Sequence, residues 1–325
     1  MKNMLKKLAA RLMRPGLVAL DQRTQQIAAA AESSEQRLAR LESHIEPGGS
    51  IGQRMAELEG LSRRTAQVLE SLAGVTIERE KHREELSYWR WLFKSPEGRA
   101  SLYAPPEEAF AYWQRERLRE LARALELTHP GATEAQTDDA LDAWCARQSA
   151  VEIGAGPYPA LAAAPRWNRA VAVDPIARAY AEEGILPDAA GHVTYIEASG
   201  ERIPLPASFA DLVIIENALD HVSDPIAVLT EIRRLLRPGG LLWVLVDLST
   251  YSDHMHPHPF DEARVRGLLR ETGFEAVKDR VSDHKSHPKA YGEFRGLLRK
   301  PAESASRLPS GIEAKSVHEA AGLRR

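Results

Sequence analysis

Two glycines separated by one residue offer backbone amides that could bind a ligand. Gly154 and Gly156 follow the apolar run 150–153, and the small residues 161–164 come next. A short buried strand, a glycine turn and the start of a helix form the nucleotide-binding end of a doubly wound α/β sheet. Asp174 ends a second apolar run 20 residues after Gly154, where a carboxylate can accept hydrogen bonds from both hydroxyls of a ribose. This spacing predicts nucleotide or nucleoside binding.

A loop rich in histidine is the second concentration of reactive side chains. His254, His256 and His258 alternate with other residues just after the apolar run 240–247. Alternating histidines could bind zinc, but an extended loop separates their rings and no pair of carboxylates completes a site. We therefore predict no metal. Part of a lid over the acceptor and a plain exposed loop are both open interpretations of this stretch.

The elements that would position these residues alternate along the chain. Apolar strands are predicted at 150–154, 170–174, 193–197, 211–216 and 240–247, with helices after the first two and at 225–236 and 261–271. Residues 274–281 and 291–300 could add a terminal pair of strands. Such alternation predicts an α/β domain over residues 148–300, with a doubly wound, mostly parallel sheet and helices on both faces. Ligands bind at the carboxyl ends of such strands.

Four motifs in this order resemble the class I S-adenosylmethionine-dependent methyltransferases, of the type 11 kind. They read Val-Glu-Ile-Gly-Ala-Gly, Ala-Val-Asp-Pro, Ile-Pro-Leu-Pro-Ala-Ser-Phe-Ala-Asp-Leu-Val and Leu-Arg-Pro-Gly-Gly-Leu-Leu-Trp-Val. The resemblance covers about residues 148–300 and implies a Rossmann-like sheet of seven strands, the last antiparallel, with S-adenosylmethionine as cofactor. A dehydrogenase fits less well, because the pattern lacks the third glycine of the dinucleotide fingerprint.

The resemblance also implies which residues bind the cofactor. Gly154 and Gly156 would admit its methionyl end, Glu152 would fix the loop or meet the amino group, and Asp174 would hold the ribose. Ser199 and Gly200 stand where the family usually has an acidic residue near adenine, and Asn217 would line the pocket. For each polar residue, a loop cap or a turn is the alternative role.

Methyl transfer to a hydroxyl also needs a group that removes a proton. Small-molecule O-methyltransferases of this type often have a histidine and an acid at the positions of His221 and Asp247, which suggests a general base and an orienting carboxylate. Packing at a helix start is the alternative role of His221. Asp220 is expected to begin that helix.

The first half of the chain reads differently. Residues 1–16 carry five cations and no acid up to Arg14, with apolar residues at helical spacing. This amphipathic segment could lie on an anionic membrane surface through residues 1–14, or form a solvated helix. Residues 17–93 show heptads interrupted by Pro47-Gly48-Gly49. They predict a coiled coil or helical hairpin that associates with a second copy or a partner helix, without chemistry of its own.

Two further segments complete the division of the chain. Residues 94–147 predict a helical connector, with one helix from Pro106 to about Leu127 and another from 133 to 145. The first should bury Phe110, Trp113, Leu118, Leu121 and Leu125. The connector either covers the cofactor or packs on the sheet edge. Residues 301–325 have the composition of a disordered tail.

Composition sets outer bounds on function. The formal net charge of −3 over 325 residues gives no nucleic-acid footprint. The single cysteine, Cys145, excludes an intramolecular disulfide and suits a reducing cytoplasm. The sequence lacks a signal peptide and an apolar run long enough to span a bilayer. We therefore expect a cytoplasmic protein, with peripheral contact at the inner face of the membrane if residues 1–14 bind it.

Together these patterns predict an S-adenosylmethionine-dependent methyltransferase with a helical docking or oligomerisation segment. A sugar or surface-glycan precursor is the first expected acceptor, and other small hydroxylated acceptors remain open. The alternative is a coiled-coil scaffold whose methyltransferase-like domain binds the cofactor without turnover. Tyr158 and Ser199, which depart from the family pattern, favour that alternative.

Overall fold

The computed structural model describes residues 59–60, 62–64, 78–187 and 191–302. One seven-stranded sheet organises this part of the chain, with the strand order β3-β2-β1-β4-β5-β7-β6. The first five strands pair in parallel, whereas β7 is antiparallel to both of its neighbours. The chain order therefore reverses beside β1, between β2 on one side and β4 on the other, and this switch point is where such sheets bind ligands.

The strands match the apolar runs closely. Their bounds are β1 Ser149–Ile153, β2 Arg169–Asp174, β3 Thr194–Glu197, β4 Ala210–Glu216, β5 Leu236–Leu248, β6 Glu275–Ser282 and β7 Gly292–Arg299. This confirms the predicted fold class, including the antiparallel last strand. The helix expected after β1 is only a short 3-10 turn, η1 Ala160–Ala163, because Pro157, Pro159 and Pro165 surround it.

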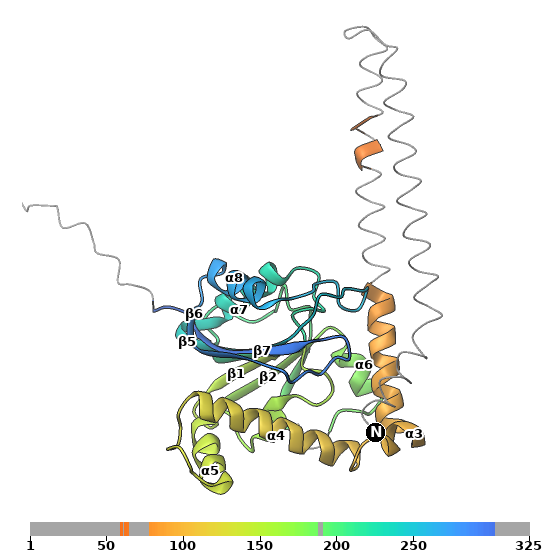
Figure 1. Cartoon of the computed structure of the whole chain (residues 1–325). Helices are drawn as coiled ribbons and strands as arrows, with labels where there is room; N and C mark the ends of the chain where they lie inside the picture. The colour runs from red at the N-terminus through yellow and green to blue at the C-terminus, as the bar shows by residue number, and fades with distance from the viewer. Residues whose placement is uncertain (1–58, 61, 65–77, 188–190, 303–325) are drawn as a thin grey trace, which may run out of the picture.

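Helices cover both faces of the sheet (Figure 1). On one face lie α7 Pro225–Leu235 and α8 Glu262–Glu271, over a core that includes Val213, Val244 and Phe294. On the other face lie α4 Pro106–Ala124 and α5 Glu134–Cys145. Two shorter helices, α3 Pro96–Ala100 and α6 Ala177–Glu182, lie beside the carboxyl ends of the strands.

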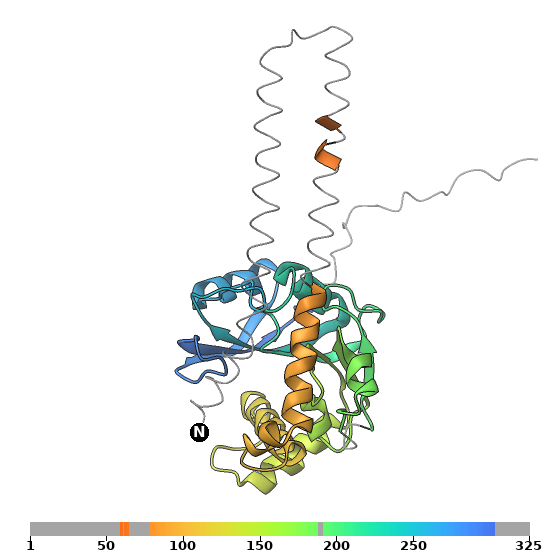
Figure 2. The ribbon, with the colours of Figure 1, turned by 90° about the vertical axis from the view of Figure 1, so that its right-hand side faces the viewer.

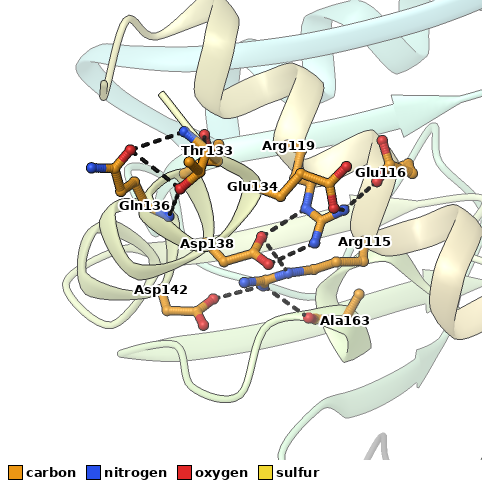
Figure 3. Close-up of polar contacts among 10 residues, drawn as sticks. Arg115, Glu116, Arg119, Thr133, Glu134, Gln136, Asp138, Asp142 and Ala163 are labelled. Atoms are coloured by element: carbon orange, nitrogen blue, oxygen red, sulfur yellow. Dashed lines mark hydrogen bonds and ion pairs between the residues drawn. The ribbon is translucent and has the colours of Figure 1, made fainter. Parts of the chain in front are cut away.

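Charged side chains join α4 to α5 (Figure 3). The Arg115 guanidinium donates to Asp138 at 3.0 Å and to Asp142 at 2.6 Å, and Arg119 donates to Asp138 at 2.6 Å. Thr133 and Gln136 form a capping box at the start of α5. The connector therefore folds as part of the α/β body, on the face of the sheet.

The buried face of α4 differs in part from the predicted one. Leu118 and Leu121 are fully buried as expected, but the Trp113 side chain is 36% exposed. Gln114 takes the inner position instead, because its amide donates to the carbonyl of Tyr158 at 2.6 Å. Residue 113 consequently lies off the stripe that faces the sheet, although its type predicts burial.

A helix over residues 78–94 lies along the edge where the parallel strands end (Figure 2). Leu92 and Phe93 are buried against Ile176, Tyr180 and Ile185. Ion pairs from Arg90 and Lys94 to Glu183 join the same helix to the end of α6. This stretch was predicted as the end of the heptad segment, and its apolar side chains pack on the α/β domain. We call residues 78–94 the edge helix.

We predict that the edge helix is needed for the stability of the domain. A chain that begins at residue 95 should lose about 3–6 kcal/mol of unfolding free energy. Burial of the side chains of Leu92 and Phe93 contributes about 1.5–3 kcal/mol each. A chain that begins at residue 78 should keep the full-length stability in thermal and denaturant unfolding. Light scattering of the full-length chain and of the chain that begins at residue 78 checks whether the heptad residues before 78 drive self-association. Equal stability of the two shortened chains would contradict the packing role.

Several predictions fall outside the described residues. These are the amphipathic segment 1–16, most of the heptad segment 17–93 and the tail from residue 303 onward. Among the described residues, no helix is both long and apolar enough to cross a membrane.

Candidate active site

The glycine turn adopts a conformation that only glycine adopts easily. Gly154 and Gly156 have φ values of +65° and +60°, in the left-handed region. A Cβ at Gly154 would lie 2.3 Å from the Cβ of Ala218, which follows β4. A Cβ at Gly156 would lie 3.4 Å from the indole of Trp89 in the edge helix. The turn thus lies between the end of β4 and the edge helix, and a side chain at Gly154 would collide with Ala218.

Glu152, a residue of β1, holds the segment that follows the glycine turn. Its carboxylate accepts hydrogen bonds from the backbone N–H of Ala160 at 2.9 Å and of Leu161 at 3.0 Å. Burial raises the pKa of Glu152 to about 8, and these two N–H groups oppose that shift. Both carboxylate oxygens of Glu152 therefore bind backbone N–H groups of this loop, which favours its predicted role in fixing the loop over a contact with the cofactor's amino group.

Asp174 holds the glycine turn to the end of β2. One oxygen accepts from the N–H of Gly156 at 2.9 Å, and the other accepts from the N–H of Ile176 at 3.0 Å. The side chain is only 2% exposed. Burial and the nearby Glu85 carboxylate raise the pKa of Asp174 to about 7. Each carboxylate oxygen retains a lone pair, so a ribose hydroxyl could still donate to it.

The other predicted cofactor residues lie around the same strand ends. Ser199 is exposed and exchanges hydrogen bonds with Glu201, whereas Gly200 packs tightly, since a Cβ there would lie 3.0 Å from Ile153. Asn217 has a φ of +48° and donates to Ser286 at 3.0 Å. Its buried side-chain oxygen has no hydrogen-bond partner within the described part of the chain. That oxygen is an acceptor available to a ligand.

Three histidines meet beyond β4 and β5. The rings of His221 and His256 lie 4.4 Å apart between centroids, and those of His256 and His287 lie 4.6 Å apart. The Nε2 atom of His221 lies 3.9 Å from a carboxylate oxygen of Asp220. We call these four residues the histidine cluster. Of the histidine loop only His256 belongs to it, because His254 contacts Glu84 and His258 contacts the Ser223 carbonyl.

Asp220 does not begin a helix, contrary to the expectation from the sequence. The residue at the start of α7 is Asp224, whose carboxylate accepts from the N–H groups of Ile226 and Ala227. Asp220 is instead buried beside His221, with 9% of its surface exposed. The three residues between Asp220 and Asp224 form the approach to α7, so the helix starts later than the pattern suggested.

Asp247 lies at the end of β5 and holds a neighbouring loop. Its carboxylate accepts from the N–H of Ser286 at 3.0 Å and from the N–H of His287. Asp247 thereby positions the ring of His287 in the histidine cluster, which no sequence pattern indicated. Burial raises the pKa of Asp247.

Burial also governs the protonation of the cluster. It lowers the pKa of His221 well below its usual 6.5, and the positive charges of His256 and Lys81 act in the same direction. The His221 imidazole is consequently neutral near pH 7 and has a free lone pair. Burial raises the pKa of Asp220 to about 6.

A small pocket, with a volume of about 10 Å³, opens at this cluster. It lies at the carboxyl edge of the sheet, on the β5 side of the glycine turn. Its lining combines carboxylates, imidazoles and one phenol ring, which suits a polar acceptor. The lining residues are Asp220, Asp247, Ser249, Tyr251, His256, His258, Pro259 and His287.

The edge helix adds side chains that the sequence did not point to. Lys81 is buried and donates to the carbonyl of His221. Glu84 meets His254 at 3.2 Å, and Glu78 accepts from the Ser223 hydroxyl at 2.7 Å. The heptad pattern had suggested only solvated charges here. A signal was present in the dense charges and aromatic residues of 78–94, but heptad spacing alone could not connect them to loops 140 residues away.

Comparison with known proteins finds similarity over part of the α/β domain. Residues 151–244 match the family model described as a methyltransferase domain. A ubiquinone/menaquinone biosynthesis C-methyltransferase, UbiE, from Vibrio campbellii is 30% identical over 121 residues, which is 27% of this chain and 46% of that protein. The same enzyme from Proteus mirabilis is 28% identical over 120 residues, or 27% and 47% of the two chains. The chain thus spans about half the length of the curated relatives it matches.

Solved structures with a similar chain path were also found. The N-methyltransferase NodS from Bradyrhizobium japonicum WM9 superposes with a TM-score of 0.43 at 17% identity, covering 58% of this chain and 97% of that one. A SAM-dependent methyltransferase from Methanosarcina mazei superposes with a TM-score of 0.41 at 16% identity, covering 49% and 94%.

Proposed function

Since residues 151–244 belong to the class I S-adenosylmethionine-dependent methyltransferases, we propose that this chain methylates a hydroxyl oxygen of a small acceptor. A sugar or surface-glycan precursor is our first candidate. The observation that carries the proposal is the position of the pocket. A pocket lined by carboxylates and imidazoles lies at the same sheet edge as the glycine turn and Asp174.

The residues around the glycine turn fit S-adenosylmethionine. Gly154 and Gly156 allow the sharp left-handed turn after β1, and Asp174 offers carboxylate lone pairs for ribose hydroxyls. The unpartnered oxygen of Asn217 can accept a hydrogen bond from the same ligand. When bound, S-adenosylmethionine supplies a methyl group on a sulfonium, which is already activated for transfer.

The chain itself must then align the acceptor and remove its proton. In the proposed arrangement the acceptor lies at the pocket, and it donates its hydroxyl proton to the neutral imidazole of His221, whose ring packs against the lining residue His256. Asp247 supports this geometry by holding the loop that carries His287. Lys81 fixes the backbone of His221 by donating to its carbonyl.

A labelling experiment tests the function. Candidate acceptors are incubated with S-adenosylmethionine that carries a deuterated methyl group, and products are analysed by mass spectrometry and NMR. We expect a labelled O-methyl group on a hydroxylated acceptor. Labelling at carbon of a quinone precursor would favour C-methylation, which is the activity in the names of the UbiE relatives. Tight cofactor binding with no product from any acceptor class would favour the scaffold alternative.

Two proposals concern the first half of the chain. Self-association or a partner helix would use residues 17–93, and a weak contact with an anionic membrane surface would use residues 1–14. Both are supported only by sequence patterns: the heptads, and the five cations of the first 14 residues. Sedimentation with anionic vesicles tests the second, since no binding by the intact chain would contradict it.

A further inference from the structure

We propose that Asp220, His221 and His256 form a binding site for one divalent transition-metal cation, such as Zn²⁺. Each residue offers one ligand atom, and these three atoms lie within 4.8 Å of one another. Two imidazoles and one carboxylate suit zinc and its neighbours in the first transition row. Nothing in the sequence pattern joined these residues, since His256 is 35 residues from His221.

An unsatisfied buried oxygen supports this site. Asp220 is 9% exposed, and its Oδ1 atom has no hydrogen-bond partner in the described part of the chain. Its other oxygen lies 3.9 Å from Nε2 of His221. A buried carboxylate oxygen without a donor is costly, and a bound cation removes that cost.

The orientation of His256 gives a second, independent indication. Its Nδ1 atom lies 3.0 Å from Oδ1 of Asp253, and the N–H of His256 donates to the same oxygen at 2.8 Å. A carboxylate on Nδ1 fixes the tautomer in which Nε2 has the free lone pair. Metal-binding histidines in proteins usually have such a carboxylate partner. Asp253 would therefore tune the ligand without touching the cation.

The three ligand atoms must draw together when the cation binds. Two ligands of a tetrahedral zinc ion lie about 3.3–3.6 Å apart, because each bond is about 2.0–2.2 Å long. The observed spread of up to 4.8 Å therefore requires the side chains to approach one another by about 1 Å. Asp220 and His256 also line the pocket, so a fourth position faces open space. The carboxylates of Asp220, Asp247 and Asp253 face the site together with Lys81 and the ring of His287, and they favour added positive charge there.

Occupancy of this site has a consequence for the proposed reaction. A cation bound to Nε2 of His221 uses the lone pair that would receive the acceptor's proton. We therefore expect Zn²⁺ to inhibit O-methylation, and a chelator to restore it. This consequence rests on the proposed function, whereas cation binding itself does not.

Titration of the full-length, untagged protein tests the site. Calorimetry with Zn²⁺ should give one strong equivalent per chain, and Co²⁺ should give visible absorption typical of nitrogen and oxygen ligands. Asp220→Asn and His256→Ala should each abolish this binding. Asp253→Asn should weaken it by about 10–100-fold, the usual effect of losing a partner behind a metal-binding histidine.

The matched control is His129→Ala, because His129 is exposed on a turn far from the cluster along the chain. It should bind Zn²⁺ like the unaltered protein. Circular dichroism of each variant checks that the fold is retained. No strong equivalent in the unaltered protein, or full binding by both ligand variants, would overturn the site. Methyl transfer that is unaffected or increased by saturating Zn²⁺ would overturn the proposed inhibition. Calorimetry alone would then decide whether the site binds the cation.

Discussion

Replacing His221 by alanine should lower turnover by about 10²–10⁴-fold, the usual contribution of a positioned general base. Affinity for S-adenosylmethionine should change little, because the glycine turn and Asp174 make the expected cofactor contacts. The measurement is kcat with the best acceptor from the labelling experiment, together with the cofactor Kd from calorimetry, both in metal-free buffer.

The structural reason lies in the surroundings of the imidazole. Burial and the nearby positive charges lower the pKa of His221, so the ring enters the reaction neutral. Lys81 holds its backbone, and His256 packs against its ring. Removing the ring therefore removes a proton acceptor that the fold has already desolvated and oriented. The loss should appear in kcat more than in cofactor binding.

Controls separate this effect from a general loss of structure. His129→Ala removes an exposed imidazole and should leave kcat unchanged. Asp220→Ala is not a suitable control, because Asp220 belongs to the histidine cluster and does not begin a helix. If His221→Ala keeps near-normal turnover while His256→Ala or His258→Ala abolishes it, the base is on the loop after β5 and not at His221.

The sheet was predictable because its signals are local. Most of the parallel strands are rich in apolar residues, and tight turns or helices follow within a few positions. The positions of Gly154, Gly156 and Asp174 depend on that same local pattern, and all three lie at the predicted sheet edge. Sequence spacing is sufficient when one strand and its following turn carry the site.

The acceptor side was less predictable because it is assembled from distant segments. His221, His256 and His287 come from three loops, and only the tertiary fold brings their rings together. His287 is held there by Asp247 through a backbone N–H group, a contact that leaves no pattern in the sequence. Alternation in the histidine loop predicted three similar residues, yet the backbone turn at Asp253 directs only His256 into the cluster.

The edge helix shows a different limit. Heptad spacing describes which side chains share a face, but it does not specify what that face contacts. In residues 78–94 the aromatic side chains meet the α/β domain, and Trp89 covers the glycine turn. The charges that suggested a solvated surface include Lys81, which is 6% exposed. Composition alone could not distinguish a coil partner from a neighbouring domain.

Replacing Asp174 by alanine should weaken S-adenosylmethionine binding by about tenfold to 10⁴-fold, since each 1.4 kcal/mol is a factor of ten in affinity. The estimate corresponds to one or two hydrogen bonds to a charged group, at about 1.5–3 kcal/mol each. Part of the loss should come from the turn itself, because Asp174 also accepts from the N–H groups of Gly156 and Ile176. Calorimetric titration with S-adenosylmethionine, and with its demethylated product, measures the change.

The pH dependence provides an independent check on the same carboxylate. Burial and Glu85 raise the pKa of Asp174 to about 7, so the free protein holds it partly protonated at neutral pH. Ribose hydroxyls donate best to the ionised form. Cofactor affinity should therefore rise as the pH increases from 6 to 8, and this rise should be absent in Asp174→Ala.

Two further variants separate loss of the ribose contact from disturbance of the glycine turn. Asp174→Asn retains one acceptor and should fall between the unaltered protein and Asp174→Ala, with thermal unfolding as the check on structure. Asp139→Asn changes an exposed carboxylate on α5 and should bind the cofactor normally. Unchanged affinity in folded Asp174→Ala would discard the ribose contact. Tight binding of NAD with none for S-adenosylmethionine would contradict the cofactor, since Asp174 at the end of β2 is placed to hold a ribose of either ligand.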